Sequence, residues 1–304
     1  DNISLESILN SKITSCEISD AYLVNKVKGQ KVENIDDVRN YIHTNSFNKY
    51  ILKQNLSFSG IGNYIFSGEE FDLKTKQREI TKLFEKGKFV IACYMDRVVD
   101  LGSVLEIKKS NFKVNTYLNY INDKTKYRGS FYFKDQLELE KYLINYDIDY
   151  SKDIFYIYKA IFLELKEKYK IKKIQIDSFI FRDGAKFGFM PIIEFNYRKT
   201  FGEVGLELSR IYSPNGYSNC LVVNNDKLKP CQRLTETINN LGELNYDINT
   251  KSGVIILSPS NTISNPKRFS TYFLVAPNFK KLKEVTDCFY RAMGLKNLFK
   301  LKEM

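Results

Sequence analysis

The sequence predicts an α+β protein whose sheets are mainly antiparallel. Patterns typical of helices and of strands are intermixed along all 304 residues. Hydrophobic residues make up 43% of the chain and aromatic residues 14%, which is the composition of a folded protein. A strand–turn–strand pattern in the second half is the clearest local signal. A chain of this length can bury a sizeable core and form more than one subdomain.

Cysteine and histidine usage narrows the chemistry. The five cysteines are an odd number, and no two of them have the CxxC spacing of a zinc or redox site. This argues against a disulfide framework and predicts a reducing, cytoplasmic setting. Because His43 is the only histidine, acid–base or metal chemistry must come from Asp, Glu, Lys, Arg and Tyr.

Charge and hydropathy limit the partners. No apolar run approaches the roughly 18–20 residues needed to span a bilayer, and no signal peptide is recognisable, so we expect no membrane partner. The chain starts at Asp1 rather than Met, which is consistent with an upstream piece that was removed or left out. A net charge of +11 suits nucleic acid or a phosphorylated ligand. The basic residues are, however, spread thinly among Asp and Glu, so we do not expect nucleic acid.

The first fifty residues contain short elements. Residues 4–9 form an amphipathic turn, and residues 21–24 have a strand pattern. Asn34 is a predicted N-cap, because Asp36 and Asp37 follow it in the first turn of a helical pattern. These elements predict the order helix, short strand, helix.

A glycine-rich segment separates two apolar strands, residues 49–53 and 64–66. Lys53 ends the first strand, and the segment that follows contains Ser59, Gly60 and Gly62. The backbone N–H groups of such a loop can close over phosphates, with Lys53 supplying positive charge. The alternative is an ordinary hairpin loop, because this pattern alone has low specificity.

The next segment suits a purine nucleoside. A helical pattern over residues 79–86 ends at Gly87, and residues 89–94 form a buried-type strand. A turn at residues 95–97 leads into a return strand over residues 98–105 that carries Asp100. Backbone groups of residues 92–95 would read the base, and Asp100 would accept from a ribose hydroxyl or orient a phosphate lysine. Alternatively, Asp100 pairs with a neighbouring Lys or Arg.

The remaining elements alternate. Further strands are predicted at residues 112–119 and 129–133, and strong amphipathic helices at residues 135–144 and 153–169. After a helix that begins at residue 202, strand and helix patterns follow at residues 218–223, 232–241, 253–257, 272–276 and 279–293. No Pro/Gly-rich linker and no internal repeat divides the chain.

A hairpin in the second half brings acidic residues onto one face. Residues 174–181 and 186–196 alternate as strands around a turn signal at Asp183-Gly184. If these two residues form the loop, Asp177 lies opposite Met190, about 13 Å along the ladder from Glu194. A loop four residues longer, centred nearer Lys186, would instead bring Asp177 level with Glu194 on the same face. Gly188 and Pro191 are compatible with such an irregularity.

The return strand carries Glu194, Asn196 and Arg198 at alternate positions, so they would share one face while the residues between them point into an apolar layer. A carboxylate, an amide oxygen and a guanidinium in a row suit a hard cation such as Mg²⁺ and the phosphates it carries. Two carboxylates on an inward face are costly unless a cation lies between them. The alternative is a half-exposed strand whose polar side faces water.

Together these segments resemble the ATP-grasp superfamily. The resemblance covers roughly residues 10–210, and its most specific element is Asp177 followed by Glu194-Phe195-Asn196-Tyr197-Arg198. Members of this family fold as two α+β subdomains that grip ATP, and most join a carboxylate to an amine or similar nucleophile through an acyl-phosphate. The resemblance implies an N-terminal subdomain over residues 1–95 that holds the phosphate loop. A C-terminal subdomain over residues 96–304 would hold the metal-binding hairpin and an α+β extension.

The resemblance also implies roles for individual residues. Lys53 would contact the ATP phosphates, with Lys12 as a second phosphate lysine, and Ser59, Gly60 and Gly62 would close over them. The backbone of Cys93, Tyr94 and Met95 would be the adenine hinge, beside Asp100. Asp177, Glu194 and Asn196 would hold Mg²⁺ (or Mn²⁺), and Arg198 would stabilise charge on the transferring phosphoryl group.

Two departures from the family pattern matter. Ala92 stands where many relatives carry a glutamate, which puts the details of nucleotide contact in doubt. Only about fifty residues precede Lys53, so the usual N-terminal domain is expected to be missing or reduced. A homo-oligomer or a partner subunit would then supply that surface for the substrates.

The sequence therefore predicts an ATP-dependent carboxylate–amine ligase that acts on small-molecule substrates. The alternative is a nucleotide-binding or interaction module that kept the fold and lost ligation, which Ala92 and the short N-terminus favour. A third hypothesis, a nucleic-acid-binding protein, is supported only by the net positive charge. A hydrolase using Asp177 and Glu194 as an acid–base pair would leave Lys53 and the glycine-rich loop without a role.

Overall fold

The computed structural model describes residues 4–22, 29–57, 62–121, 126–224, 241–258 and 269–295. Within them, helices are interspersed with strands that form two sheets of four and eight strands. The predicted α+β class is confirmed, since helices and strands are intermixed and nine strand pairings within these residues are antiparallel. The chain folds into two compact units, and Asp1–Thr116, Asp123–Lys126 and Tyr146–Arg198 make up the first.

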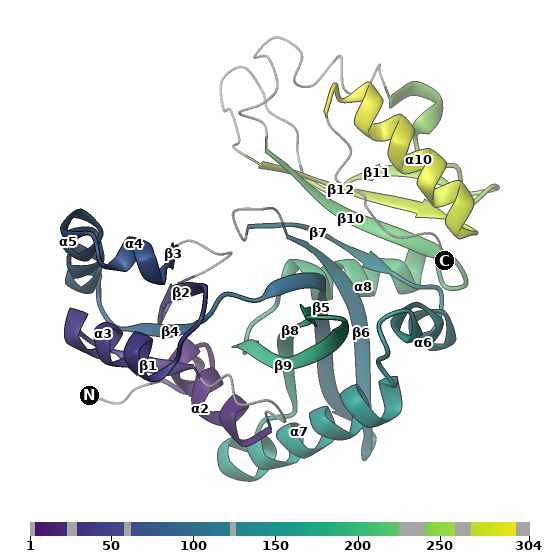
Figure 1. The fold of residues 1–304 in the computed structure, drawn as a ribbon. Helices are drawn as coiled ribbons and strands as arrows, with labels where there is room; N and C mark the ends of the chain where they lie inside the picture. Colours follow the sequence, from purple (N-terminus) through teal and green to yellow (C-terminus); the bar gives the residue numbers. More distant parts are fainter. Residues whose placement is uncertain are drawn as a thin grey trace. The chain divides into compact units, whose positions relative to one another are not determined.

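The four-stranded sheet of the first unit has the order β1-β4-β2-β3 (Figure 1). Its strands are β1 (Gln30–Val32), β2 (Lys49–Gln54), β3 (Asn63–Ser67) and β4 (Phe89–Cys93). Its helices are α3 (Ile35–Thr44), α4 (Gly68–Phe71) and α5 (Lys74–Leu83), and a 3₁₀ turn, η1 (Phe84–Lys86), follows α5. Alternate strand residues and one face of each helix meet in a buried core that includes Val38, Tyr50, Leu52, Phe66 and Ile80.

Capping residues fix the helix starts in this part of the chain. The predicted N-cap Asn34 accepts from the backbone N–H groups of Asp36 and Asp37 at 2.9 and 3.0 Å. Ser67 and Glu70 form a reciprocal capping box at the start of α4. In the core, Tyr50 stacks on Phe66 with ring centroids 5.7 Å apart.

The strands that matter most for the site also belong to the first unit. They are β5 (Asp96–Lys108), β8 (Lys173–Asp183) and β9 (Lys186–Asn196), with β9 at the edge of the eight-stranded sheet. The π-helix η2 (Tyr150–Phe155) runs into α7 (Tyr156–Tyr169). Tyr158 of α7 donates to Ser178 of β8 at 2.7 Å in a buried position, so α7 packs on the β8 face that lies opposite Asp177.

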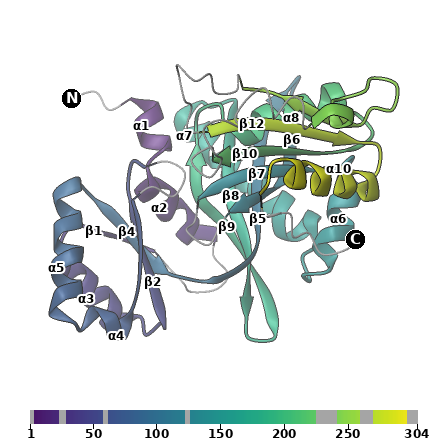
Figure 2. The ribbon, with the colours of Figure 1, turned by 90° about the horizontal axis from the view of Figure 1, so that it is seen from above.

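Two N-terminal helices, α1 (Leu5–Leu9) and α2 (Lys12–Tyr22), complete this unit. Figure 2 shows α2 lying along β9, and hydrogen bonds join the two elements. Serine hydroxyls of α2 pair with backbone groups that an edge strand would otherwise leave without partners.

The second unit contains the other strands of the eight-stranded sheet. They are the end of β6 (Asn111–Ile121), then β7 (Tyr127–Tyr132), β10 (Tyr217–Asn224), β11 (Gly253–Ile256) and β12 (Phe269–Ala276). Its helices are α6 (Gln136–Ile144), α8 (Phe201–Tyr212) and α10 (Phe279–Ala292), with a 3₁₀ turn η5 (Gly242–Leu244). Gly202 and Gly205 let α8 approach the sheet, because a Cβ on either would lie 2.3 or 2.2 Å from the hydroxyl of Tyr117 or Tyr132.

Some local predictions were wrong. Ala21 and Tyr22 belong to α2 rather than to a strand, because Ser15, Ile18 and Ser19 bury one helical face; residues 23 and 24 lie outside the described residues. The predicted helix over residues 79–86 begins earlier, at Lys74. Most of the helix predicted at residues 232–241 lies outside the described residues.

Two further predictions concern boundaries and membranes. All strands of the four-stranded sheet precede residue 95 and β5 begins at Asp96, but the division of the chain into residues 1–95 and 96–304 stays a prediction. Among the described residues, no helix is both long enough and apolar enough to cross a bilayer.

Candidate functional site

The β8–β9 hairpin sets the geometry of the site. Asp183 pairs with Lys186, so the turn residues are Gly184 and Ala185. Asp177 is directly opposite Glu194, and the register that placed it opposite Met190 was wrong. The alternative register, in which Asp177 is level with Glu194, is the one observed, although the loop is not longer than two residues.

The cause of this register is an irregularity inside the ladder rather than a longer turn. Phe179 pairs with Met190 and Asp177 pairs with Glu194, so residues 191–193 of β9 lie opposite Ser178 alone. Pro191 lacks a backbone N–H and cannot donate to a regular ladder. The two extra residues keep the side-chain alternation, because a shift of two leaves every residue on its original face.

Asp177, Glu194 and Asn196 therefore share one face of the hairpin. Gln175 and Asn196 each donate to a different carboxylate oxygen of Asp177 at 3.0 Å. Burial, and then the charge of Glu194, raise the pKa of Asp177 to about 7, while the two amide donors oppose this rise. Burial and the neighbouring carboxylate thus both act against ionisation of Asp177.

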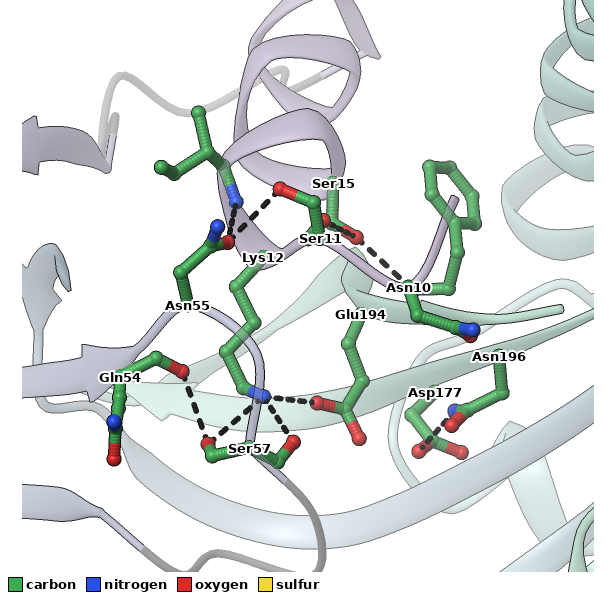
Figure 3. Close-up of polar contacts among 12 residues, drawn as sticks. Asn10, Ser11, Lys12, Ser15, Gln54, Asn55, Ser57, Asp177, Glu194 and Asn196 are labelled. Carbon is green, nitrogen blue, oxygen red and sulfur yellow. Dashed lines mark hydrogen bonds and ion pairs between the residues drawn. The ribbon is translucent and has the colours of Figure 1, made fainter. Parts of the chain in front are cut away.

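Lys12 approaches this face from the start of α2. Its ammonium lies 3.0 Å from Oε2 of Glu194 and donates to the carbonyl oxygen of Ser57 at 2.7 Å and to its hydroxyl at 3.2 Å. Figure 3 shows the lysine between Ser57 and Glu194, with Asp177 and Asn196 alongside. Lys12 is only 6% exposed, so this is a nearly buried ion pair.

Hydrogen bonds from α2, and from Asn10 just before it, to β9 and to Tyr197 just after it hold Lys12 in place. The hydroxyl of Ser15 accepts from the N–H of Phe195 at 3.0 Å, and the side chain of Asn10 accepts from the N–H of Tyr197 at 2.8 Å. Ser19 donates to the carbonyl of Ile192 at 3.4 Å. The helix is thus fixed along the strand that carries Glu194 and Asn196.

A second contact fixes the segment after β2. The Oδ1 atom of Asn55 accepts from the hydroxyl of Ser11 at 2.9 Å and from the N–H of Ile13 at 3.1 Å. Ser57 in turn donates from its hydroxyl to the carbonyl of Gln54 at 2.9 Å. The start of α2 and the end of β2 therefore meet beside Glu194.

Lys53 belongs to the same electrostatic environment. It is half-buried on β2, opposite Val90 of β4. Burial, and then the positive charge of Arg97, lower the pKa of Lys53 to about 8, whereas Glu194 acts in the opposite direction. An amine in this state gains from a nearby anionic ligand.

Asp100 has a partner within the protein. It lies 3.3 Å from Arg97, whose guanidinium is 4.3 Å from the centroid of the Phe179 ring. Burial raises the pKa of Asp100 and Arg97 partly offsets the rise. The pairing with a neighbouring arginine, one of the two predicted alternatives, is therefore present, and the predicted ribose contact stays a prediction.

The predicted adenine hinge follows β4. Cys93 ends that strand, and the N–H of Tyr94 donates to the carbonyl of Lys49 at 2.9 Å. Met95 lines a cavity of about 230 Å³ beside the β8–β9 hairpin. Its other walls include Phe181, Met190, Phe189, Tyr22 and Asp153. Ala92 lies opposite Ile51 of β2 and brings no carboxylate.

Of the remaining predicted residues, the structure describes Arg198 and Gly62. Arg198 is exposed and donates to Oδ1 of Asn196 at 2.9 Å. Gly62 has φ +82°, and a Cβ there would lie 2.6 Å from Oε1 of Gln54, so this position requires glycine. Ser59 and Gly60 lie outside the described residues.

Comparison with known proteins gives structural matches only. No family model and no curated protein matches the chain. A structure titled as the ADP complex of N5-carboxyaminoimidazole ribonucleotide synthetase matches 93% of this chain and 71% of its own, with a TM-score of 0.61 and 11% identity. Phosphoribosylamine–glycine ligase from Thermotoga maritima matches 93% of this chain and 76% of its own, with a TM-score of 0.59 and 12% identity.

A third match is the biotin carboxylase domain of 2-oxoglutarate carboxylase from Hydrogenobacter thermophilus, titled as a complex with MgADP, ADP and bicarbonate. It covers 94% of this chain and 65% of its own, with a TM-score of 0.58 and 13% identity. These enzymes share one architecture. The chain has the ATP-grasp fold. The predicted resemblance is thereby confirmed for the fold.

The oxygen atoms on this face of the hairpin suit a hard cation. Asp177, Glu194 and Asn196 offer two carboxylates and an amide oxygen on one face, which is a donor set for Mg²⁺ and also for Mn²⁺. Among the described residues, no group of three or more His, Cys, Asp or Glu side chains could hold a metal ion. A cation on this face would need further oxygen atoms beyond these three side chains.

Two residues near the Asp177–Glu194 pair were not predicted from the sequence. Gln175 donates to Asp177, and its place two residues earlier on the same strand face was a readable signal. Arg97 contacts both Asp100 and the Phe179 ring. No pattern in the sequence distinguished Arg97 from the many other Lys and Arg residues.

Proposed function

We propose that this chain binds Mg-ATP and uses it to activate a small-molecule carboxylate as an acyl-phosphate, which an amine or similar nucleophile then attacks. The observation that carries the proposal is the direct pairing of Asp177 with Glu194, next to Asn196, on an ATP-grasp fold. A partly buried carboxylate pair of this kind favours a cation, and Lys12 and Lys53 lie in the same environment.

Asp177, Glu194 and Asn196 would hold the Mg²⁺, which when bound neutralises charge on the phosphates. Lys53 would bind phosphate oxygens, because burial makes its ammonium gain from an anionic partner. Lys12 would be the second phosphate lysine. Arg198, already oriented by Asn196, would stabilise charge on the transferring phosphoryl group.

The cavity beside the hairpin supports a place for the base. Phe181, which lines it, is four residues along β8 from Asp177, or about 13 Å at strand rise. An extended nucleoside triphosphate spans such a distance with its phosphates at the carboxylates. Met95 lies in the cavity wall, as expected if the backbone of residues 93–95 reads the base.

The reaction needs no protein nucleophile. A carboxylate oxygen of the substrate attacks the γ-phosphorus, and ADP leaves. The amine then attacks the acyl carbon, its proton passes to a base, and inorganic phosphate leaves. The chain's residues contribute by positioning the reactants and neutralising charge. The reducing, cytoplasmic setting expected from cysteine usage is part of this proposal.

A second candidate is a nucleotide-binding module without ligase activity. Ala92, which brings no carboxylate to the hinge strand, favours it. Both candidates expect Mg-ATP binding, and only the first expects turnover.

The test measures ADP release from Mg-ATP over a panel of carboxylates and amines. We expect Glu194→Gln and Asn196→Ala to abolish release, and Glu284→Gln, an exposed glutamate paired with Lys281 at 3.3 Å, to leave it unchanged. Equal release by the Glu194 and Asn196 variants and the wild type would contradict the proposed metal site. Mg-ATP binding without release on the whole panel would favour the second candidate.

A further inference from the structure

The ammonium of Lys12 is saturated by contacts inside the protein. A lysine ammonium has three N–H donors. Those of Lys12 have three acceptors within reach: Oε2 of Glu194 at 3.0 Å, and the carbonyl and hydroxyl oxygens of Ser57 at 2.7 and 3.2 Å (Figure 3). The Lys12 side chain is only 7% exposed and has little access to water, so these contacts replace its hydration.

The partner of Lys12 is also a proposed metal ligand. Glu194 pairs with Asp177 across the strands, and its oxygen Oε2 is engaged by the lysine. A divalent cation and an ammonium cannot share one carboxylate oxygen at contact distance without strong mutual repulsion. A cation bound to the other oxygen of the same carboxylate would still lie close to the ammonium, so binding of either charge weakens binding of the other.

We propose that Lys12 is an internal competitor for the divalent cation at Glu194, so that the metal enters together with the nucleotide and not before it. This inference rests on the proposed function of the site. When the phosphates arrive, they give the ammonium of Lys12 a new anionic partner. Glu194 is then released to the metal.

The physical reason is a difference in the alternatives open to Lys12. Without nucleotide, displacing Lys12 from Glu194 leaves a nearly buried ammonium with only neutral partners from Ser57, which is costly. Mg²⁺ also gives up its water reluctantly. With nucleotide, the ion pair is exchanged for another ion pair, so displacement costs little. The site therefore discriminates between free metal and metal–nucleotide without any change of its ligands.

The test measures binding of Mn²⁺ without nucleotide, from the loss of the free-ion electron paramagnetic resonance signal. We expect Lys12→Met to bind Mn²⁺ at least about tenfold more tightly than the wild type, because the competing charge is gone. Lys12→Arg keeps the charge and should bind as weakly as the wild type. Lys141→Met removes a lysine with a like ion pair, 3.0 Å from Glu138 but exposed, and should also match the wild type.

Two further variants keep the experiment decisive. In Lys12→Met/Glu194→Gln the gain should vanish, which shows that it arises at Glu194. If Lys12→Met does not fold by circular dichroism, Lys12→Gln takes its place. A neutral Lys12 variant that folds and binds Mn²⁺ no better than the wild type overturns the inference.

The same proteins separate this inference from the proposed function. A gain of Mn²⁺ binding in Lys12→Met, with no ATP binding by any variant, supports the competition and overturns the proposed function. If the wild type binds ATP but Lys12→Met binds Mn²⁺ no more tightly than the wild type, the competition is overturned and the proposed function is supported.

Discussion

Asp177 lies directly opposite Glu194 across the β8–β9 ladder, and residues 191–193 are accommodated opposite Ser178 alone. This pairing brings two carboxylates into neighbouring positions of an antiparallel pair, where like charges destabilise the sheet. The nearly buried Lys12 at 3.0 Å from Glu194 compensates part of that charge. The stability of the hairpin and the charge of the site are therefore linked.

The first prediction concerns that ion pair. Glu194→Gln should lower the free energy of unfolding by about 1–3 kcal/mol without nucleotide, because it leaves the Lys12 ammonium without its carboxylate. We place the value below that of a fully buried pair, since the Glu194 side chain is 21% exposed. In Lys12→Met/Glu194→Gln the loss should fall short of the sum of the single losses by at least about 1 kcal/mol. Urea unfolding at neutral pH measures all four proteins, and additive losses would contradict the pairing.

The second prediction concerns the pH dependence that Lys53 contributes. Its pKa is lowered from 10.5 to about 8, so the folded state disfavours the charged amine. The resulting destabilisation is fully present below about pH 8 and is relieved as the pH rises towards 10.5. Lys53→Met should therefore be more stable than the wild type at pH 7, and the difference should shrink above pH 8.

Nucleotide binding should show the opposite trend for the same residue. We expect the ATP affinity of the wild type to fall as the pH rises through about 8, where Lys53 loses its proton, while Lys53→Arg stays charged and shows a smaller fall. Calorimetric titration with Mg-ATP between pH 6.5 and 9.5 checks this. If both proteins show the same dependence of ATP affinity on pH, Lys53 does not bind the phosphates.

The sequence was sufficient for the parts of the fold that depend on local pattern. The N-cap at Asn34 follows from side chains within a few residues of it. The α+β class and the strand face shared by Glu194 and Asn196 follow from the alternation of polar and apolar residues. Such features need no knowledge of what packs against them.

The parts that failed depend on contacts between distant segments. Residues 21–22 continue a helix because Ser15 and Ser19 of α2 pair with backbone groups of β9, more than 170 positions away. The register at Asp177 depends on how residues 191–193 are accommodated, and a turn signal at Asp183-Gly184 carries no information about that. The contact of Lys12 with Glu194 arises from the same docking of α2.

The third prediction tests that docking. The hydroxyl of Ser15, a residue only 1% exposed, accepts from the N–H of Phe195. Ser15→Ala leaves this buried N–H without its acceptor, so we expect the free energy of unfolding to fall by about 1–3 kcal/mol. Mg-ATP affinity should fall as well, because Phe195 lies between Glu194 and Asn196. Ser209→Ala is the matched control, since its hydroxyl only donates to the Leu206 carbonyl within one helix. Equal thermal shifts with Mg-ATP for both variants would show that α2 does not position these residues.

The fourth prediction concerns Gly188 in the proposed base pocket. A Cβ at this position would lie 2.4 Å from Cζ of Phe181, so Gly188→Ala forces the ring to move in the cavity that both residues line. We expect a loss of about 1–3 kcal/mol in stability, as for overpacked sites, and weaker binding of ATP. Gly68→Ala is the control, because its nearest neighbour, Cε2 of Tyr50, lies at an ordinary 3.7 Å.

The ligand used in that comparison identifies which part of the nucleotide reaches the cavity. If the base lies against Phe181, Gly188→Ala weakens the binding of ATP and adenosine by similar factors. It leaves the binding of inorganic triphosphate unchanged, because triphosphate would bind only the lysines and, through Mg²⁺, the carboxylates. An equal loss for triphosphate would instead mean that the substitution disturbs the whole hairpin. Wild-type affinity for all three ligands would place the base elsewhere.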